Sequence, residues 1–270
     1  MFNTIDYEAI WKDERFQDWY NYRPYDVDYI KYAEHDPHIV ATAHKIEDVY
    51  YAFANARTYF LNAGSDNYGE LYDTDEVSMR FGKAQFINSA ILEYALCLDL
   101  SWQVIWANIQ PSSLEHLAKL QYKDMEALCN RENVKTMLDQ SISLGGLDAE
   151  RAKELKQIME DFDNSDEVKK LREIYNALKH RGTFMYEGLG EDSGTMKVKV
   201  NGNGVKILSR KTYSFAELES ILFEYHTLFI DYFQKIIKAT MPDDFDVKSV
   251  NAADFFHMML KMKKAQDTSQ

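Results

Sequence analysis

Hydrophobic residues recur along most of this chain at the spacing of α-helices. From Pro37 to about Gly64 they follow one another at steps of three and four, which predicts a long amphipathic helix. The stretch from Met79 to Ile109 is apolar on more than one face, so we expect it to be the central, most buried helix. Shorter patterns predict further helices over 112–129, 134–144, 148–162, 166–181, 215–239 and 252–263. The expected fold class is therefore mainly α.

Local signals indicate where several of these helices begin. Thr74, Ser112, Ser165 and Ser214 stand where a side-chain oxygen would cap the first turn of a helix. One segment instead alternates with a period of two: 196–200 and 205–209 flank the residues Asn-Gly-Asn-Gly, whose types suit the positive φ angles of a turn. We expect a β-hairpin inserted in the helical fold near residues 196–210.

The patterns also suggest a division of the chain. Residues 1–35 are acidic and rich in irregularly spaced aromatic residues, and we expect an N-terminal arm packed on the main body. Residues 36–240 would form the helical domain with its hairpin, and 241–270 a C-terminal helix and tail.

The charge balance argues against a protein that coats DNA without specificity. The chain has a net charge of −13, and affinity for nucleic acid depends on neutralising phosphates with Lys and Arg. The segment 169–211 is an exception, because it carries ten basic residues against four acidic ones. Contact with a polyanion is therefore expected only there.

We expect the protein to stay in the cytoplasm without a membrane partner. The N-terminus lacks the basic and apolar regions of a signal peptide, and we expect no apolar run long enough to span a bilayer. Cys97 and Cys129 lie in helical patterns, where reduced thiols are expected rather than a disulfide or a metal pair.

No cofactor or metal is expected. Gly188-Leu-Gly190 lies in a loop and not between a strand and a helix, so it is no phosphate-binding motif. His35, Asp36, His38 and His44 could supply ligands, but their spacing is not that of a known metal site.

The strongest candidate chemistry lies between Arg172 and Arg181. Asn176 and His180 are four residues apart and share one face of a helix, and Arg172 lies two turns earlier, about 12 Å from His180 along the axis. A histidine can transfer a proton, an amide can orient it, and a guanidinium can bind phosphate oxygens. The alternative is that His180 and Arg181 are ordinary C-terminal helix residues favoured by the helix dipole.

In this helix, residues 175–181, Tyr-Asn-Ala-Leu-Lys-His-Arg, resemble the motif of the HEPN superfamily. The resemblance implies a HEPN-like helical bundle, and many HEPN proteins are metal-independent ribonucleases of toxin and anti-phage systems that join as homodimers around one RNA cleft. Asn176 matches the polar position of that motif and His180 its histidine. Tyr175 occupies the position where the motif has arginine. Either Arg172 substitutes from one turn earlier, or this branch has the fold without the cleavage.

The leading functional hypothesis is therefore RNA cleavage or RNA binding in a defence or toxin context. His180 would act as acid and base, Asn176 would orient it, Arg172 would bind phosphate, and the further substrate-binding residues would be Arg181, Lys179 and Tyr175. The alternative hypothesis is a non-catalytic helical interaction module that binds a small ligand or a protein partner such as an antitoxin.

Overall fold

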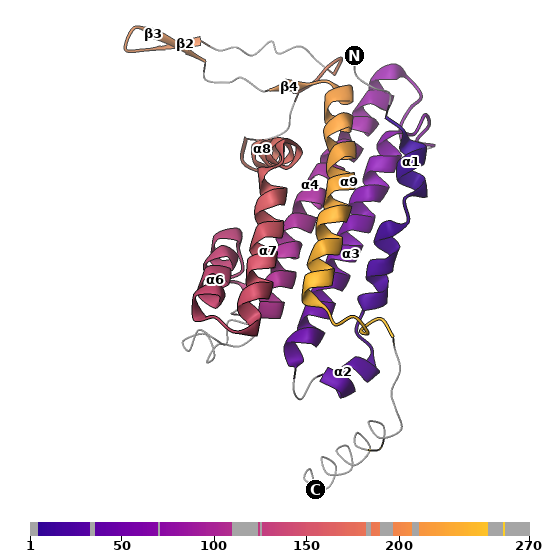
Figure 1. Cartoon of the computed structure of the whole chain (residues 1–270). Helices are drawn as coiled ribbons and strands as arrows, with labels where there is room; N and C mark the ends of the chain where they lie inside the picture. Colours follow the sequence, from indigo (N-terminus) through magenta and orange to yellow (C-terminus); the bar gives the residue numbers. More distant parts are fainter. Residues whose placement is uncertain are drawn as a thin grey trace, which may run out of the picture. The chain divides into compact units, whose positions relative to one another are not determined.

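The computed structural model describes residues 5–32, 36–69, 71–109, 124, 126–181, 185–189, 197–206, 211–247 and 256. Helices dominate it, which confirms the mainly α class (Figure 1). In chain order the elements are α1 Tyr7–Lys12, the 3₁₀-helix η1 Arg15–Tyr22, α2 Asp26–Tyr32, α3 Pro37–Ala63, α4 Glu76–Ile109, α6 Arg131–Leu144, α7 Leu147–Asn164, α8 Asp166–Arg181, β1 Met185–Tyr186, β2 Lys197–Val200, β3 Asn203–Lys206, β4 Thr212–Tyr213 and α9 Phe215–Thr240.

Six long helices lie where the hydrophobic pattern predicts them, as α3, α4, α6, α7, α8 and α9. The expected cap of α4 was wrong by one residue. Asp75, not Thr74, accepts hydrogen bonds from the backbone N–H groups of Val77 and Ser78, both at 3.0 Å. Most of the helix expected over 112–129, and all of that over 252–263 except Phe256, lies outside the described residues.

The residues cluster into two compact units that interleave along the chain. Helices α3, α4, α7 and α9 each contribute residues to both. Unit 1 comprises Met1–Asp13, Ala52–Leu96 and Phe162–Phe229, and unit 2 comprises Glu14–Tyr51, Cys97–Asp161 and Ile230–Gln270.

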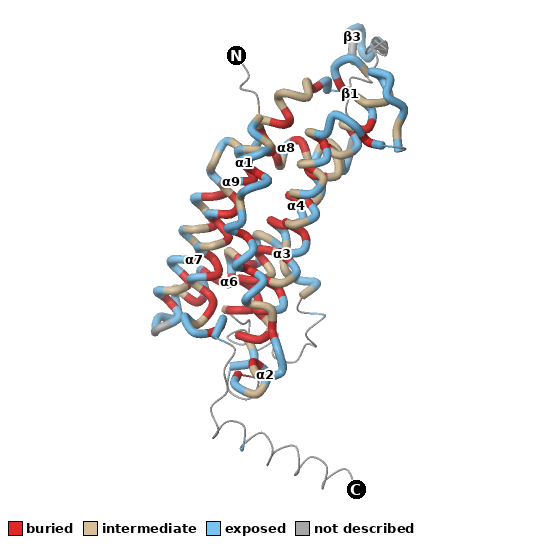
Figure 2. Tube along the Cα trace, turned by 90° about the vertical axis from the view of Figure 1, so that its right-hand side faces the viewer, coloured by how far each residue is buried: buried red, intermediate tan, exposed pale blue. Residues whose placement is uncertain are grey.

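The core of unit 1 is aromatic and contains a buried histidine. Phe53 of α3 stacks on the His226 ring of α9 at 4.9 Å between centroids, and Tyr94 of α4 meets Phe53 edge to face at 5.7 Å. The Tyr94 hydroxyl lies 2.8 Å from His226 Nδ1, and the Tyr225 hydroxyl donates to the Tyr94 carbonyl at 3.2 Å. These contacts hold α3, α4 and α9 side by side in unit 1, and the buried residues line their facing sides (Figures 1 and 2).

Helix α4 is longer and more apolar than the sequence reasoning allowed. Among the described residues it is the one helix that could cross a membrane by length and composition, which corrects the expectation that no such run exists. Within its most apolar window, 67% of the residues are buried inside the protein. Such burial is that of a core helix, so α4 is weak evidence for a membrane span.

The N-terminal arm contains three short helices that its irregular pattern did not predict. Helix α1 is capped by Asp6, which accepts a hydrogen bond from Ala9 N at 3.0 Å. In unit 1, Tyr7 of α1 donates its hydroxyl hydrogen to the buried carboxylate of Glu219, which also pairs with Lys83 Nζ at 2.5 Å. The first part of the arm therefore packs within unit 1.

The rest of the arm packs within unit 2. The buried Trp19 of η1 meets Phe233 edge to face at 4.7 Å, and Arg15 pairs with Asp231 at 2.8 Å. Both partners lie on α9, so aromatic and ionic contacts together fix η1 in this unit.

The β-hairpin is confirmed over 197–206, with a tighter turn than expected. Its turn consists of Asn201 and Gly202, with φ angles of 52° and 81°, and Asn203 already pairs with Val200 in the ladder. Two residues with positive φ form the turn that best matches the twist of the two strands. A second ladder was not predicted: β1 and β4 pair in parallel over two residues each, too short to show an alternating pattern.

Candidate functional site

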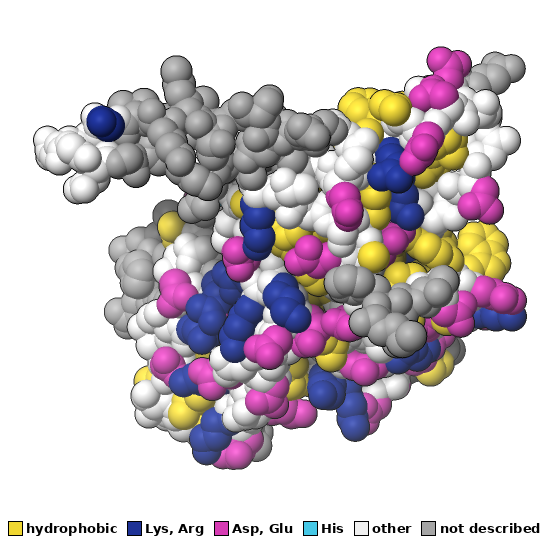
Figure 3. Space-filling model, turned by 90° about the horizontal axis from the view of Figure 1, so that it is seen from above, with side chains coloured by type: hydrophobic (Ala, Val, Ile, Leu, Met, Phe, Trp, Pro, Cys, Tyr) yellow, Lys and Arg dark blue, Asp and Glu magenta, His cyan; other side chains and the backbone are white. Residues whose placement is uncertain are grey.

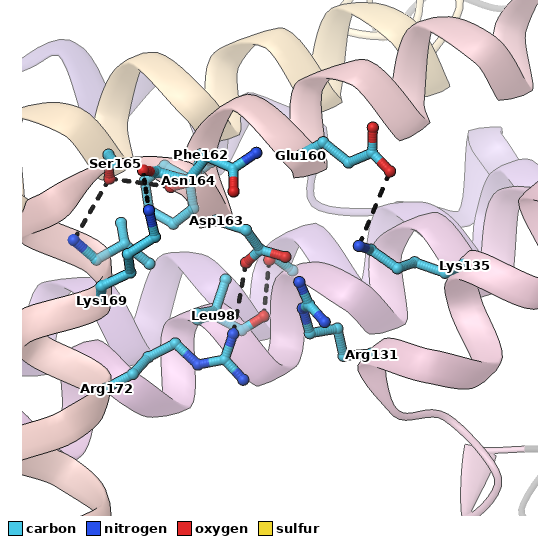
Figure 4. Close-up of polar contacts among 12 residues, drawn as sticks. Leu98, Arg131, Lys135, Glu160, Phe162, Asp163, Asn164, Ser165, Lys169 and Arg172 are labelled. Carbon is cyan, nitrogen blue, oxygen red and sulfur yellow. Dashed lines mark hydrogen bonds and ion pairs between the residues drawn. The ribbon is translucent and has the colours of Figure 1, made fainter.

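Helix α8 carries every residue of the candidate site, and its own sequence defines its start. Ser165 Oγ accepts from Val168 N at 3.4 Å, as its expected capping role requires, and Asp166 and Glu167 follow in the first turn. Lys169 Nζ donates to the Asn164 carbonyl at 2.6 Å across the junction with α7 (Figure 4). The apolar face of α8 is buried, which turns its polar face towards solvent.

Asn176 and His180 lie together on that exposed face. Both are exposed, and neither makes a hydrogen bond or ion pair with another residue in the part of the chain that the structure describes. Because they are four residues apart on one helix, their side chains can contact the same chemical group of a ligand. The prediction that both residues serve one site is thus compatible with binding of a ligand from solution.

Lys179 and Tyr175 form a second pair on the same helix. The Lys179 ammonium lies 5.5 Å from the centroid of the half-buried Tyr175 ring. The ring restricts the ammonium by a cation–π contact while leaving the lysine exposed. The Tyr175 ring therefore supports a cation one turn away on the same helix. Arg181 is the last residue of α8, and its side chain lies outside the described atoms.

Arg172 has a partner that the sequence reasoning missed. Its Nη1 lies 3.6 Å from Oδ1 of Asp163, at the end of α7, and Figure 4 shows the guanidinium turned towards that carboxylate. The Asp163 side chain is only 5% exposed, whereas that of Arg172 is 38% exposed. A carboxylate removed from water needs a positive partner, so Arg172 has a structural role before any role in binding phosphate.

Among the described residues of the basic segment that contains α8, some cations are paired with acidic or aromatic side chains. Lys211 pairs with Glu173 at 3.3 Å and lies 4.6 Å from the Tyr213 ring, and its pKa is raised chiefly by the Tyr213 hydroxyl. On the face drawn in Figure 3, Lys and Arg side chains are interspersed with Asp and Glu. In the hairpin, the register pairs Lys197 with Lys206. Arg210, which follows the hairpin in the same segment, lies outside the described residues.

Other polar features of the described residues do not join this site. A cavity of about 260 Å³ in unit 2 is lined by none of the expected site residues; its wall comprises Asp18, Trp19, Tyr22, Gln234, Ile237, Lys238, Met241, Pro242 and Asp243. Within the described ranges no group of three or more His, Cys, Asp and Glu residues could hold a metal ion. Of the four metal candidates named from the sequence, His35 lies outside those ranges.

Comparison with known proteins leaves the family open. No family model matches this chain, and neither a curated protein nor a solved structure matches it.

Proposed function

We propose that this chain is a HEPN-like helical protein that binds RNA through the polar face of α8. The observation that carries the proposal is the exposed pair Asn176 and His180, beside the exposed Lys179, in a segment with ten basic and four acidic residues. The chain as a whole has a charge of −13, so this segment is the place where a phosphate backbone meets the least repulsion. The setting we propose is a cytoplasmic defence or toxin system, with the protein as a homodimer.

RNA binding is supported better than RNA cleavage. In cleavage His180 would move the proton of the ribose 2′-hydroxyl, which is RNA's own nucleophile, while a cation stabilises the phosphate in the transition state. Arg172 is committed to Asp163, and Tyr175 stands where the motif has arginine. Among the described side chains, Lys179 is then the exposed cation next to His180 in the sequence. The two side chains leave the helix about 100° apart, so the length of the lysine side chain is what would bring its ammonium to a phosphate at His180.

A binding and cleavage assay on a mixed RNA pool, with EDTA present, tests the proposal. We expect wild-type protein to bind RNA with an affinity that falls steeply with salt, and Lys179→Gln and His180→Ala to weaken that binding. Lys153→Gln is the matched control, because Lys153 is an exposed helix lysine on α7, outside the basic segment. Equal RNA binding by all four proteins would exclude α8 as the RNA site.

Cleavage is read from the same reactions. Product formed by wild type and lost in His180→Ala, with folding intact, would establish His180 as the acid and base of a metal-independent reaction. RNA binding without product would leave the binding proposal standing and remove the catalytic one.

The second candidate is a non-catalytic interaction module, which the Arg172–Asp163 pair specifically favours. In the motif helix, the one arginine side chain that the structure describes stabilises a buried carboxylate. It therefore does not serve as the phosphate-binding arginine that catalysis would need. On this hypothesis no variant cleaves RNA, and binding of a protein or small ligand does not weaken steeply with salt.

A further inference from the structure

Four exposed tyrosines of unit 2 lie in one network with the ion pair of Arg23 and Glu47, on η1, α2, α3 and the turn that joins η1 to α2. The exposed fractions are 36% for Tyr20, 46% for Tyr25, 44% for Tyr29 and 48% for Tyr51. We refer to these four residues as the tyrosine surface. Large aromatic side chains this exposed in one network are unusual enough to mark an interaction site.

Arg23 joins two of the four rings. Its guanidinium carbon lies 5.8 Å from the centroid of Tyr20 and 6.0 Å from that of Tyr25, and its Nη1 donates to the Tyr20 hydroxyl at 2.8 Å. Its Nε pairs with Glu47 at 3.0 Å. The rings of Tyr20 and Tyr25 are thus brought together around a cation that is already neutralised.

The other two rings belong to the same network. His44 lies 4.0 Å from Glu47 and hydrogen-bonds to the Tyr29 hydroxyl. Tyr51 meets Tyr50 edge to face at 5.3 Å, and Tyr50 is itself 5.3 Å from the Tyr20 ring. The four exposed rings therefore form one connected surface.

Contacts with less exposed groups hold these rings in place. Tyr50 stacks on the buried Phe16 at 5.8 Å, which supports both Tyr20 and Tyr51. The Tyr25 backbone N–H donates to the buried carboxylate of Asp28 at 2.8 Å and so fixes the start of α2. Because rings held in this way lose little freedom on binding, the surface is preorganised.

Residues 14–51, which include the tyrosine surface, carry more acidic than basic side chains. Every Lys and Arg of residues 14–51 is already in an ion pair: Arg15 with Asp231, Arg23 with Glu47, Lys31 with Asp244 and Lys45 with Glu126. The exposed carboxylates of Glu14, Asp18 and Asp26 make no ion pair within the part of the chain that the structure describes. Residues 14–51 thus offer carboxylates and aromatic faces, while each of their own lysine and arginine side chains is in an ion pair.

We infer that the tyrosine surface binds an arginine- or lysine-rich segment of a partner protein. Cations are attracted to the faces of tyrosine rings, and tyrosine is among the residues that most often dominate the energy of protein interfaces. The unpaired carboxylates complement the charge of such a segment. Single-stranded RNA could stack on the same rings, but stacking sites for nucleic acid combine aromatic rings with a positive groove, which is missing from these residues. The inference is independent of RNA binding by α8.

The probe that tests it is a short fluorescent peptide of alternating arginine and serine, titrated into the full-length protein. Alternating glutamate and serine, and a uridine oligonucleotide, serve as comparison ligands. Tyr25→Ser/Tyr51→Ser removes two rings, and Tyr25→Phe/Tyr51→Phe keeps them. Phe81→Ser is the matched control, because Phe81 on α4 is 49% exposed and belongs to unit 1.

We expect the arginine peptide to bind wild type, the Phe variant and Phe81→Ser alike, and to bind the double Ser variant about tenfold more weakly. Asp26→Lys should weaken binding as well, because it reverses one of the unpaired carboxylates. If the arginine peptide binds all variants equally, it is attracted only by the net negative charge of the protein, and the inference is overturned. Dependence of oligonucleotide binding, or of self-association measured by light scattering, on Tyr25 and Tyr51 would overturn it in favour of RNA or of a second copy.

Discussion

Replacing Arg172 by alanine separates a structural role of this residue from a role in binding RNA. The substitution removes one guanidinium contact from the Asp163 carboxylate, which is 5% exposed and keeps its other interactions. At the observed 3.6 Å, the direct attraction is about 5 kcal/mol for an effective dielectric constant of 20. Arg172 is itself 38% exposed, so solvent screening and the desolvation of both groups offset much of that attraction. We expect the free energy of unfolding to fall by about 1–3 kcal/mol.

Urea unfolding followed by circular dichroism at neutral pH measures this loss, and a double-mutant cycle assigns it to the pair. Asp163→Asn, Arg172→Ala and the double variant should show a coupling energy of about 1 kcal/mol, because the arginine matters less once the carboxylate charge is gone. RNA affinity of the folded Arg172→Ala protein should change by less than about threefold.

The opposite result would refute this reasoning. If Arg172→Ala keeps the stability of wild type while its RNA affinity collapses, the guanidinium is a phosphate ligand, and its contact with Asp163 contributes little to folding.

Three further predictions concern the buried and half-buried groups. Tyr94→Phe removes the hydroxyl from buried His226 and should lower the free energy of unfolding by about 1–2 kcal/mol, measured in urea. Burial lowers the pKa of His38 in the folded state, so on acidification the unfolded chain binds a proton before the folded protein does. The free energy of unfolding should therefore fall as the pH drops through about 6.5 and level off below the folded pKa. His38→Gln should flatten this profile, which urea titrations at successive pH values measure. Burial raises the pKa of the Cys129 thiol to about 12, and Cys97 is buried, so a chromogenic disulfide reagent should label both slowly in the native protein and rapidly in urea.

The helical fold was predictable because its long helices bury continuous apolar faces. The 3.6-residue period of α3 and α9 is visible in the sequence, and the side chains of Ser165 and Ser214 mark helix starts that the structure confirms, the latter through a hydrogen bond from Glu217 N at 3.1 Å. The short arm helices were not predictable in the same way, since single contacts such as that of Trp19 with Phe233 hold them, rather than a periodic face.

The candidate site was predictable only in part, for a physical reason. Residues four apart on a helix share a face, so the common exposed side of Asn176 and His180 followed from spacing alone. The partner of Arg172 could not be predicted from spacing. Five acidic residues lie between 160 and 167, and spacing does not indicate which of their side chains is buried. Only the packing at the junction of α7 and α8 selects Asp163 (Figure 4).

The attachment of α1 limits how this protein can be shortened for experiments. The Tyr7 ring lies 5.5 Å from that of Phe60 in a tilted arrangement, and it covers Gly64 so closely that an added Cβ would lie 2.7 Å from it. Deleting the first thirteen residues to obtain a minimal RNA-binding fragment would therefore uncover apolar surface on α3 and leave Glu219 without the Tyr7 hydroxyl. A fusion tag should accordingly be joined ahead of the intact arm.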